Sequence, residues 1–340
     1  MTASEYQDAI RLGRQALQLA EALELPHIRA AALDTIGCSR CGLGDPGGLD
    51  DIEQSIAVAT AANSPPNVVR GYMTLSGTLT DIGDLDGALA AQREGLRLAE
   101  RFGLVGQARF LAGHVAQQRY FRGEWDEEVR AIDQAIGAES SARLQYSDRD
   151  MYEFRARIRL ARGDLAGALA DATRALDLAR SVRESQSLLP ALALAARVQC
   201  ARGRTEEAGV LADELLQLLS DTGFVSPAAF FTADLVVALL ALDRAGEFLH
   251  VVGRAPANSR WFDAAAAFAS REFERAAAVY AEIGSVPDEA YARLRAAERL
   301  LEQGRRAEAD EQLERALAFY RSVGATAYIE EGEALVAPTA

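Results

Sequence analysis

Few residues of this chain have the chemistry that a metal site or a redox site requires. Cysteine occurs three times, at Cys38, Cys41 and Cys200, and histidine also occurs only three times. Cys38 and Cys41 have Cys-x-x-Cys spacing, but a zinc site needs about four ligands and a thioredoxin-like motif needs a strand-helix-strand setting. Because free cysteine usually behaves as a small buried apolar residue, we expect all three to be structural. We therefore expect no metal and no cofactor.

Lysine is absent, and all 36 cationic residues are arginine. The chain can therefore form neither a P-loop phosphate site nor a Schiff base with a carbonyl substrate. The sequence also contains no Gly-x-Ser-x-Gly elbow and no His-Glu-x-x-His motif. These absences favour binding over catalysis. An enzyme that uses a groove as its active site is the alternative, and its acid or base would come from Asp34, His114, Tyr120 or Glu153.

The charge balance excludes two classes of partner. Acidic residues outnumber arginines by 50 to 36, which gives a net charge of −14. Nucleic acids and anionic lipid surfaces both bind cationic surfaces, so neither is an expected partner. The most apolar stretch, from Pro227 to Leu242, is interrupted by Asp234 and is shorter than the roughly 20 residues that span a bilayer. With sparse cysteines and no signal-peptide pattern, we expect a cytoplasmic protein.

Internal repeats show which elements position the side chains. Gly-Asp-Leu-x-Gly-Ala-Leu-Ala begins at Gly83 and again at Gly163, and related turns begin at Gly44, Gly123 and Gly203. The spacings are 39, 40, 40 and 40 residues. The same frame extends forward to Asp243 and backward to Ser4, and two shorter units follow with turns at Arg271 and Gly304. A regular period of this length indicates a repeat architecture.

Each unit is expected to be two antiparallel helices joined by a tight turn. Apolar and small residues after each turn recur with helical spacing. A small residue stands seven positions before each turn: Gly37, Ser76, Ala116, Ala156, Ala196 and Ala297, with a looser match at Val236. Small side chains there allow the paired helices to approach closely. The prediction is an all-α, right-handed solenoid of about eight helix pairs, in which neighbouring pairs bury each other's apolar faces.

The ends of the chain and its division follow from the same frame. Residues 4–23 match the second helix of a unit, and residues 325–337 are expected to form a helix that caps the stack. Without a preceding helix, the apolar face of residues 4–23 should be exposed or covered by a partner. We divide the chain into a superhelix of 40-residue repeats over residues 1–253 and two shorter repeats with the capping helix over residues 254–340.

The signature Leu75-Ser76, Gly83, Ala88, Gly95 resembles the tetratricopeptide (TPR) pattern. More specifically, the chain resembles the C-terminal TPR region of bacterial multidomain ATPase regulators, which are ATPase- and adenylate-cyclase-associated or LuxR-type. The resemblance lies in the segments that begin at Ala156, Pro287 and Leu317. It implies a sensor or docking module that regulates a neighbouring ATPase. Because the nucleotide-binding, cyclase and helix-turn-helix parts are absent, the chain is either a fragment or a stand-alone relative.

A binding site should lie on the concave face that the first helices of the repeats form. In the TPR register, the inward positions stand three before, one after and four after the small residue, and one helical turn earlier. The candidate binding residues are Arg70, Met73, Phe110, Gln117, Tyr120, Glu153, Arg157 and Arg197. Arginine and tyrosine are frequent at recognition hot spots, and arginine can clamp a carboxylate or phosphate. Glu153 and Arg157 could instead form only an i,i+4 ion pair.

We therefore expect a non-catalytic, regulatory scaffold that binds a protein or peptide partner, or a small anionic effector, in its concave groove. A solenoid enzyme and a self-association module are the alternatives, and a homodimer is the form that self-association would take. Neither the ligand nor the oligomeric state follows from the sequence.

Overall fold

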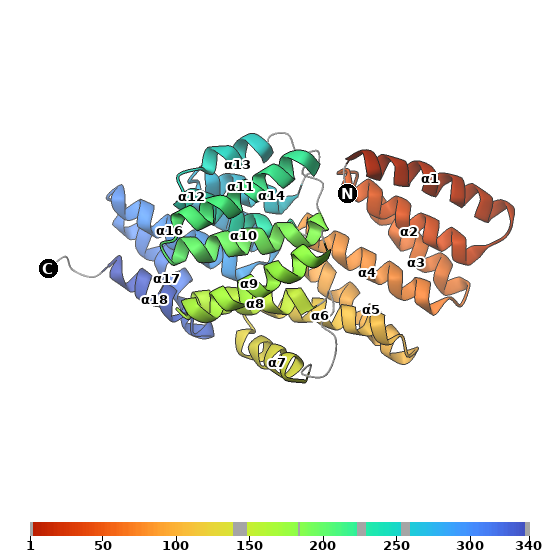
Figure 1. The fold of residues 1–340 in the computed structure, drawn as a ribbon, viewed down its shortest axis with the longest axis horizontal. Helices are drawn as coiled ribbons and strands as arrows, with labels where there is room; N and C mark the ends of the chain where they lie inside the picture. The colour runs from red at the N-terminus through yellow and green to blue at the C-terminus, as the bar shows by residue number, and fades with distance from the viewer. Residues whose placement is uncertain (1–2, 139–147, 183, 223–228, 253–258, 337–340) are drawn as a thin grey trace. The chain divides into compact units, whose positions relative to one another are not determined.

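The computed structural model describes residues 3–138, 148–182, 184–222, 229–252 and 259–336. Every regular element in these ranges is an α-helix, and 18 helices are described (Figure 1). The helices are α1 (Ala3–Ala22), α2 (Pro26–Gly42), α3 (Gly48–Ala61), α4 (Pro65–Ile82), α5 (Leu85–Arg101), α6 (Val105–Arg122), α7 (Trp125–Ala138), α8 (Asp148–Ala161), α9 (Leu165–Val182), α10 (Ser185–Ala201), α11 (Thr205–Thr222), α12 (Phe231–Ala241), α13 (Ala245–Val252), α14 (Arg260–Ala269), α15 (Phe273–Ile283), α16 (Val286–Glu302), α17 (Arg306–Val323) and α18 (Thr326–Ala334). The all-α class predicted from the sequence is confirmed. Within the described ranges, no helix has the length and apolarity to cross a membrane.

The turns confirm the repeat frame. The eight turn residues that the period identifies all have a positive φ: Gly44, Gly83, Gly123, Gly163, Gly203, Asp243, Arg271 and Gly304. Glycine adopts this left-handed conformation without a steric penalty, which explains why it ends most of the first helices. At Gly83, for example, φ is 88° and the N–H donates to the carbonyl of Thr80 to close α4. Asp243 and Arg271 adopt the same geometry, at 58° and 59°, without that advantage.

The aspartate that follows the turn glycine begins the second helix of the pair. The Asp84 carboxylate accepts a hydrogen bond of 2.9 Å from the N–H of Gly87, and Asp164 accepts one of 2.8 Å from Gly167. Both residues are N-caps, which satisfy an amide that has no partner within its own helix. The repeated Gly-Asp-Leu-x-Gly phrase therefore encodes a helix stop and a helix start within five residues.

The small residues allow close helix packing, as expected. A Cβ atom added to Gly37 would lie 2.5 Å from the carbonyl oxygen of Gly48, so the α2 and α3 backbones meet there. At the matching positions of later repeats, Ser76 is 1% exposed and Ala156 and Ala196 are fully buried. The interface inside each helix pair is therefore built around a residue with little or no side chain.

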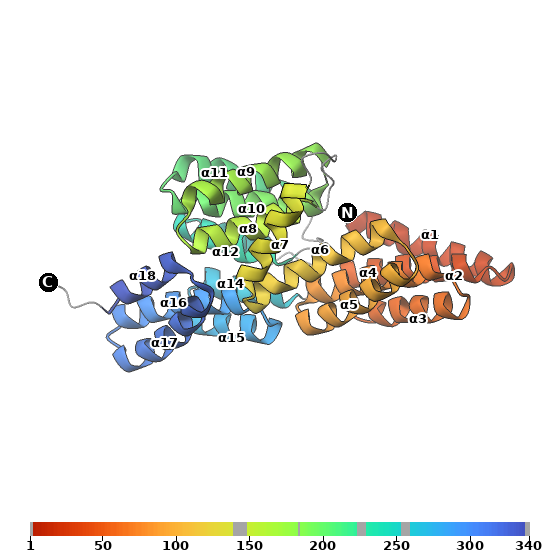
Figure 2. The ribbon, with the colours of Figure 1, turned by 90° about the horizontal axis from the view of Figure 1, so that it is seen from below.

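The chain forms two compact units, each with its own core. Unit 1 comprises Met1–Val115, Leu219–Ala229 and Gly253–Ser259, and unit 2 comprises Ala116–Leu218, Phe230–Val252 and Arg260–Ala340. Unit 1 thus holds α1–α5 and the first half of α6. Unit 2 holds the second half of α6, α7–α10, most of α11 and α12–α18, in which α14–α15 and α16–α17 are consecutive hairpins (Figure 2). These units are defined by compactness. The boundary between residues 253 and 254, which separates 40-residue repeats from shorter ones, is defined by repeat length and remains a prediction.

Unit 2 closes on itself. The turn after α8 contacts the turn before α18: Arg162 donates to the carbonyl of Val323 (2.9 Å), and Thr326 donates to the carbonyl of Arg162 (2.8 Å). Nearby, the rings of Trp125 and Phe319 pack edge to face at 5.6 Å. The two hydrogen bonds join positions about 160 residues apart in the sequence. As a result, α18 packs against α8 within unit 2.

Candidate functional site

Three of the predicted site residues line one groove in unit 1. Arg70 and Met73 lie on α4 and Phe110 lies on α6, and the groove has a volume of about 560 Å³. Pro66, Asn67, Thr74 and Gln107 complete its walls. Because α4 and α6 are the first helices of neighbouring repeats, this groove lies where the TPR register places a concave surface. The structure therefore brings Arg70, Met73 and Phe110 together.

Arg70 provides the positive charge of the unit 1 groove. Its Nε atom donates a 2.9 Å hydrogen bond to the carboxylate of Asp34, which is 3% exposed, whereas the Arg70 side chain is 53% exposed. Burial raises the pKa of the Asp34 carboxyl, and hydrogen bonds with Thr74 and Arg70 oppose this effect. The carboxylate binds the guanidinium through Nε, and among the described residues no hydrogen bond occupies its two terminal amino groups. This arrangement orients the cation before any ligand arrives.

Two side-chain amides line the same groove at equivalent positions. The Asn67 amide donates to the carbonyl of His27 (3.1 Å), and the Gln107 amide, 40 residues later, donates to the carbonyl of Pro66 (3.1 Å). Each bond ties a first helix to the preceding repeat. The amide oxygens of Asn67 and Gln107 accept no hydrogen bond from the described residues and so remain available to a ligand. Sequence analysis missed both residues, although their spacing of 40 was the available signal.

Glu153, Arg157 and Arg197 also come together, but inside unit 2. The Arg157 Nε atom donates to one oxygen of Asp234 (2.8 Å), and the Arg197 Nη1 atom donates to the other (2.7 Å). Glu153 lies 3.7 Å from Arg157 and accepts a 2.8 Å hydrogen bond from Arg149. None of these side chains is more than about a tenth exposed. They form a buried ionic network that joins α8, α10 and α12.

Electrostatics agree with this geometry. Burial alone would raise the pKa of Asp234, but the Arg157 and Arg197 guanidiniums hold it below its ordinary value. Burial raises the pKa of Glu153 to about 7, and Arg149 and Arg157 only partly offset it. Burial also raises the pKa of nearby Asp288 to about 6. Asp234 is therefore the carboxylate that balances the two guanidiniums.

The sequence analysis placed these arginines on an exposed inner surface, whereas the structure places them in the core. The reason is the closure of unit 2: Tyr328 on α18 accepts a 3.0 Å hydrogen bond from Arg197, and Asp234 on α12 covers Arg157. Tyr120 and Gln117 are also buried, at 5% and 7% exposed. The Tyr120 ring stacks on Trp125 at 5.7 Å. As folded, none of these five predicted residues lines an open groove.

The remaining chemical motifs are the cysteines, possible metal-ligating clusters and one glycine-rich turn. The three cysteines are free thiols. In the described part of the chain, no group of three or more histidine, cysteine or acidic residues could hold a metal ion. Gly42, Gly44 and Gly47 have the spacing of a dinucleotide-binding loop, but they connect α2 to α3 and no strand precedes them. A phosphate loop of that kind requires a strand-to-helix setting.

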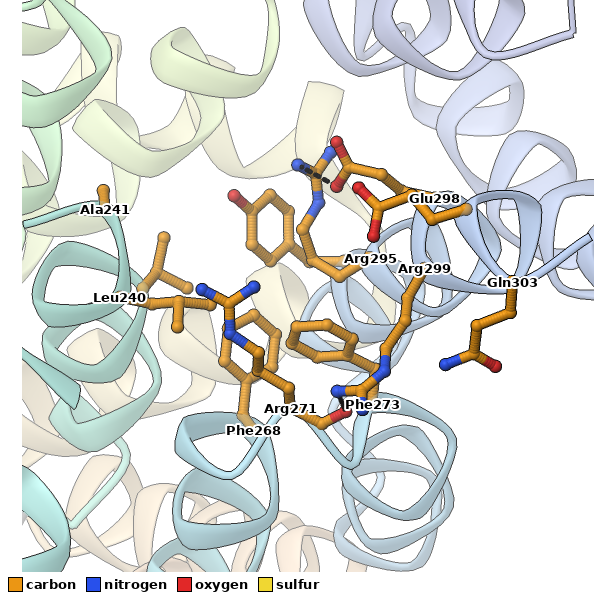
Figure 3. A pocket seen from close by; sticks show the side chains of 12 residues that line it. Leu240, Ala241, Phe268, Arg271, Phe273, Arg295, Glu298, Arg299 and Gln303 are labelled. Carbon is orange, nitrogen blue, oxygen red and sulfur yellow. Dashed lines mark hydrogen bonds and ion pairs between the residues drawn. The ribbon is translucent and has the colours of Figure 1, made fainter. Parts of the chain in front are cut away.

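Unit 2 contains a pocket that the sequence analysis did not identify (Figure 3). Its volume is about 520 Å³, and its walls come from α12, α14, α15 and α16. Four of its lining residues stand at inward positions, one or four residues after the small residue of a first helix, and so could have been predicted. They are Val237 and Leu240 on α12, Phe268 on α14 and Glu298 on α16. The turns at Asp243 and Arg271 lack glycine, which makes the repeat frame hardest to follow there.

Comparisons with known proteins concern the fold. No known sequence family and no curated protein matches the chain. The structure is similar to the crystal structure of a Rap protein in complex with competence and sporulation factor, with a TM-score of 0.62, 13% identity and 98% coverage of both chains. It also aligns with yeast Tom70 (TM-score 0.37, 12% identity, 97% of this chain and 86% of Tom70). A third alignment, to the P58(IPK) TPR domain, has a TM-score of 0.27, with 16% identity and 98% coverage of both chains. The likeness to the Rap protein and the periodic helix pairs together show an all-α, TPR-like helical-repeat fold.

Proposed function

We propose that the chain is a non-catalytic binding module and that the unit 1 groove takes an extended segment of a protein partner. The observation that carries this proposal is the convergence of Arg70, Met73 and Phe110 on one groove of about 560 Å³. The groove combines apolar walls with an oriented cation. These are complementary to a segment with an acidic side chain next to an apolar one.

The amide pair favours an extended segment over a helix. Asn67 and Gln107 lie on the first helices of neighbouring repeats, and packed helices are about 8–10 Å apart. A segment in the polyproline II conformation advances about 3.1 Å per residue with three residues per turn, so its backbone N–H groups three residues apart point the same way and match two amide oxygens at this separation. The carbonyl oxygens would accept from the ligand backbone while their NH₂ groups stay bound to His27 and Pro66.

Two further considerations support a binding role. The chain has the fold of a Rap protein whose structure was determined with a bound factor. The sequence also resembles the TPR regions of ATPase regulators, so we propose that binding in the groove regulates an attached or associated domain. An enzymatic role has no support among the described residues: Asp34, His114 and Glu153 form ion pairs or hydrogen bonds to the protein itself, and Tyr120 is buried in unit 2.

A displayed library of random peptides tests the proposal. We expect selection on the intact chain to enrich segments with an acidic residue beside an apolar one. In fluorescence anisotropy, Arg70→Gln should weaken binding of these peptides about tenfold, the loss expected for one charge-assisted hydrogen bond. Arg97→Gln is the matched control, because Arg97 is similarly exposed (57%) but pairs with Glu94 on α5, outside the groove. Equal affinity for wild type and Arg70→Gln, or no enriched peptide, would exclude the proposal.

A further inference from the structure

The pocket in unit 2 has two walls of different chemistry. One wall is aromatic and apolar: Phe268 packs against Phe273 at 4.9 Å between ring centroids and stacks on Tyr291 at 6.0 Å, while Leu240 lies across from them. Phe268 and Phe273 are 2% and 5% exposed, so their rings are held in place by the core. The other wall consists of the polar ends of Arg271, Arg295 and Arg299 with nearby glutamates.

The three arginines differ in whether their charge is already neutralised. Arg295 forms ion pairs with Glu298 (3.0 Å) and with Glu331 on α18, and it lies over the Tyr291 ring at 5.3 Å. Arg271 and Arg299 form no ion pair with a described carboxylate. In Figure 3 the guanidinium of Arg271 lies beside Leu240 and that of Arg299 lies beside Phe273, and both are on the side of the pocket away from the Arg295 guanidinium. Any added anion would therefore meet Arg271 and Arg299 rather than Arg295.

Arg299 and Arg271 are also fixed relative to each other. The Arg299 Nη1 atom donates a 2.5 Å hydrogen bond to the main-chain carbonyl of Arg271. Arg271 occupies the turn between α14 and α15, and the peptide that carries its carbonyl is held in place because the Glu272 N–H donates to the carbonyl of Ala267 (2.8 Å). A guanidinium has five N–H donors, so this bond leaves most of the Arg299 donors available. The neighbouring Glu302 lines the pocket and forms no ion pair with the described residues, so two free cations face one free anion.

We infer that this pocket binds a small amphipathic monocarboxylate, with an aromatic or branched aliphatic group against the part-exposed Leu240 and Tyr291 and its carboxylate between the guanidiniums of Arg271 and Arg299. The volume of about 520 Å³ is in the range of small-molecule sites, which are mostly apolar with a few orienting polar groups. One carboxylate would balance the excess positive charge of the pocket. The inference does not depend on the groove proposed for unit 1.

Isothermal titration calorimetry with 3-phenylpropionate, its amide and acetate tests the inference on the full chain. We expect the acid to bind, the uncharged amide to bind at least tenfold more weakly, and acetate, which lacks the apolar group, to show no binding. The variant Arg271→Gln/Arg299→Gln should lose the difference between acid and amide. Arg306→Gln is the matched control, since Arg306 is 60% exposed on α17, pairs with Asp310 and lies outside the pocket.

A second variant keeps the test independent of any effect on folding. Ala241 is exposed at the pocket, so Ala241→Glu adds a negative charge without disturbing the core and should weaken the acid more than the amide. Three results would overturn the inference: no heat with the acid, equal affinity for acid and amide, or unchanged acid binding in the Arg271/Arg299 variant. Acid binding that persists in Arg70→Gln would separate this site from the unit 1 groove.

Discussion

Replacing Asp234 with asparagine should destabilise unit 2 strongly, although the two side chains have nearly the same volume. Asp234 is 2% exposed and accepts hydrogen bonds of 2.8 Å from Arg157 and 2.7 Å from Arg197. An asparagine side chain at this position would leave two buried guanidiniums without the carboxylate that both of them face. The pKa of Asp234 lies below its ordinary value because of these two arginines, so the carboxylate is charged throughout the physiological range. The substitution therefore removes a full charge.

The magnitude follows from the burial of the network. Removal of one partner from a buried ion pair costs about 3–5 kcal/mol, because the remaining charge stays desolvated. Unit 2 has roughly two hundred residues, and 1 kcal/mol shifts the melting temperature of a unit of that size by about 2–4 °C. We therefore expect Asp234→Asn to lower the melting temperature of unit 2 by about 6–20 °C. Differential scanning calorimetry of the full chain measures this shift.

Asp310→Asn is the matched control for Asp234→Asn. Asp310 pairs with Arg306 at 3.0 Å, a similar distance, but both side chains are more than half exposed. Exposed pairs contribute at most about 1 kcal/mol, so the melting temperature should move by only a few degrees. If the two substitutions lower the melting temperature equally, or if Asp234→Asn costs less than about 1 kcal/mol, the buried network does not stabilise unit 2 in the way argued above.

Three other predictions concern stability. Burial raises the pKa of Glu128 from 4.5 to about 7, so the stability that its protonated form contributes is lost as the pH rises through 7. In urea unfolding, wild type should therefore lose about 3 kcal/mol of unfolding free energy between pH 4.5 and 8 relative to Glu128→Gln. Parallel pH profiles of the two proteins would contradict this. Gly37→Ala should lower the unfolding free energy by about 1–3 kcal/mol, because the added Cβ would lie 2.5 Å from a backbone oxygen. Gly77→Ala, whose Cβ would have no atom within 4 Å, should instead raise it by about 0.5–1 kcal/mol. Chemical denaturation in which both substitutions change the unfolding free energy in the same direction would refute this. Leu12 and Leu19 are 54% and 63% exposed on α1, so Leu12→Gln with Leu19→Gln should change the unfolding free energy by less than about 1 kcal/mol, and a larger loss in urea titrations would mean that this face is covered.

The fold could be predicted because its determinants are local. A glycine at the end of a helix, an aspartate that caps the next one and a small residue seven positions earlier act over a few residues each. Repetition at a spacing of 40 makes each signal visible several times. Gly83 and Asp84 illustrate this: one adopts a φ of 88° and the other binds the Gly87 amide. No knowledge of distant contacts was needed to place these turns.

The candidate site was only partly predictable, because which inner residues remain open depends on distant contacts. The same register places Arg70 and Arg157 on first helices, yet Arg70 lines a groove and Arg157 is 5% exposed. The difference comes from Asp234, 77 residues after Arg157, and from the contact between the α8 and α18 ends. A local spacing rule identifies the face of the helix but not what covers that face.

The buried network also limits where a ligand can act in unit 2. The Arg197 guanidinium lies 4.9 Å from the centre of the Tyr291 ring. The guanidinium of Arg295, which lines the pocket, lies 5.3 Å from the same ring centre. Tyr291 thus contacts both the sealed network and the open pocket. A ligand that packs against Tyr291 would stabilise the closed form of unit 2, because the ring position depends on Arg197 and on Tyr328 of α18. Binding should therefore raise the melting temperature of unit 2 in wild type and also in Arg70→Gln. Because any ligand that binds only the native state raises its melting temperature, the coupling is tested by ligand affinity in Asp234→Asn: unchanged affinity would show that the pocket and the closure are independent.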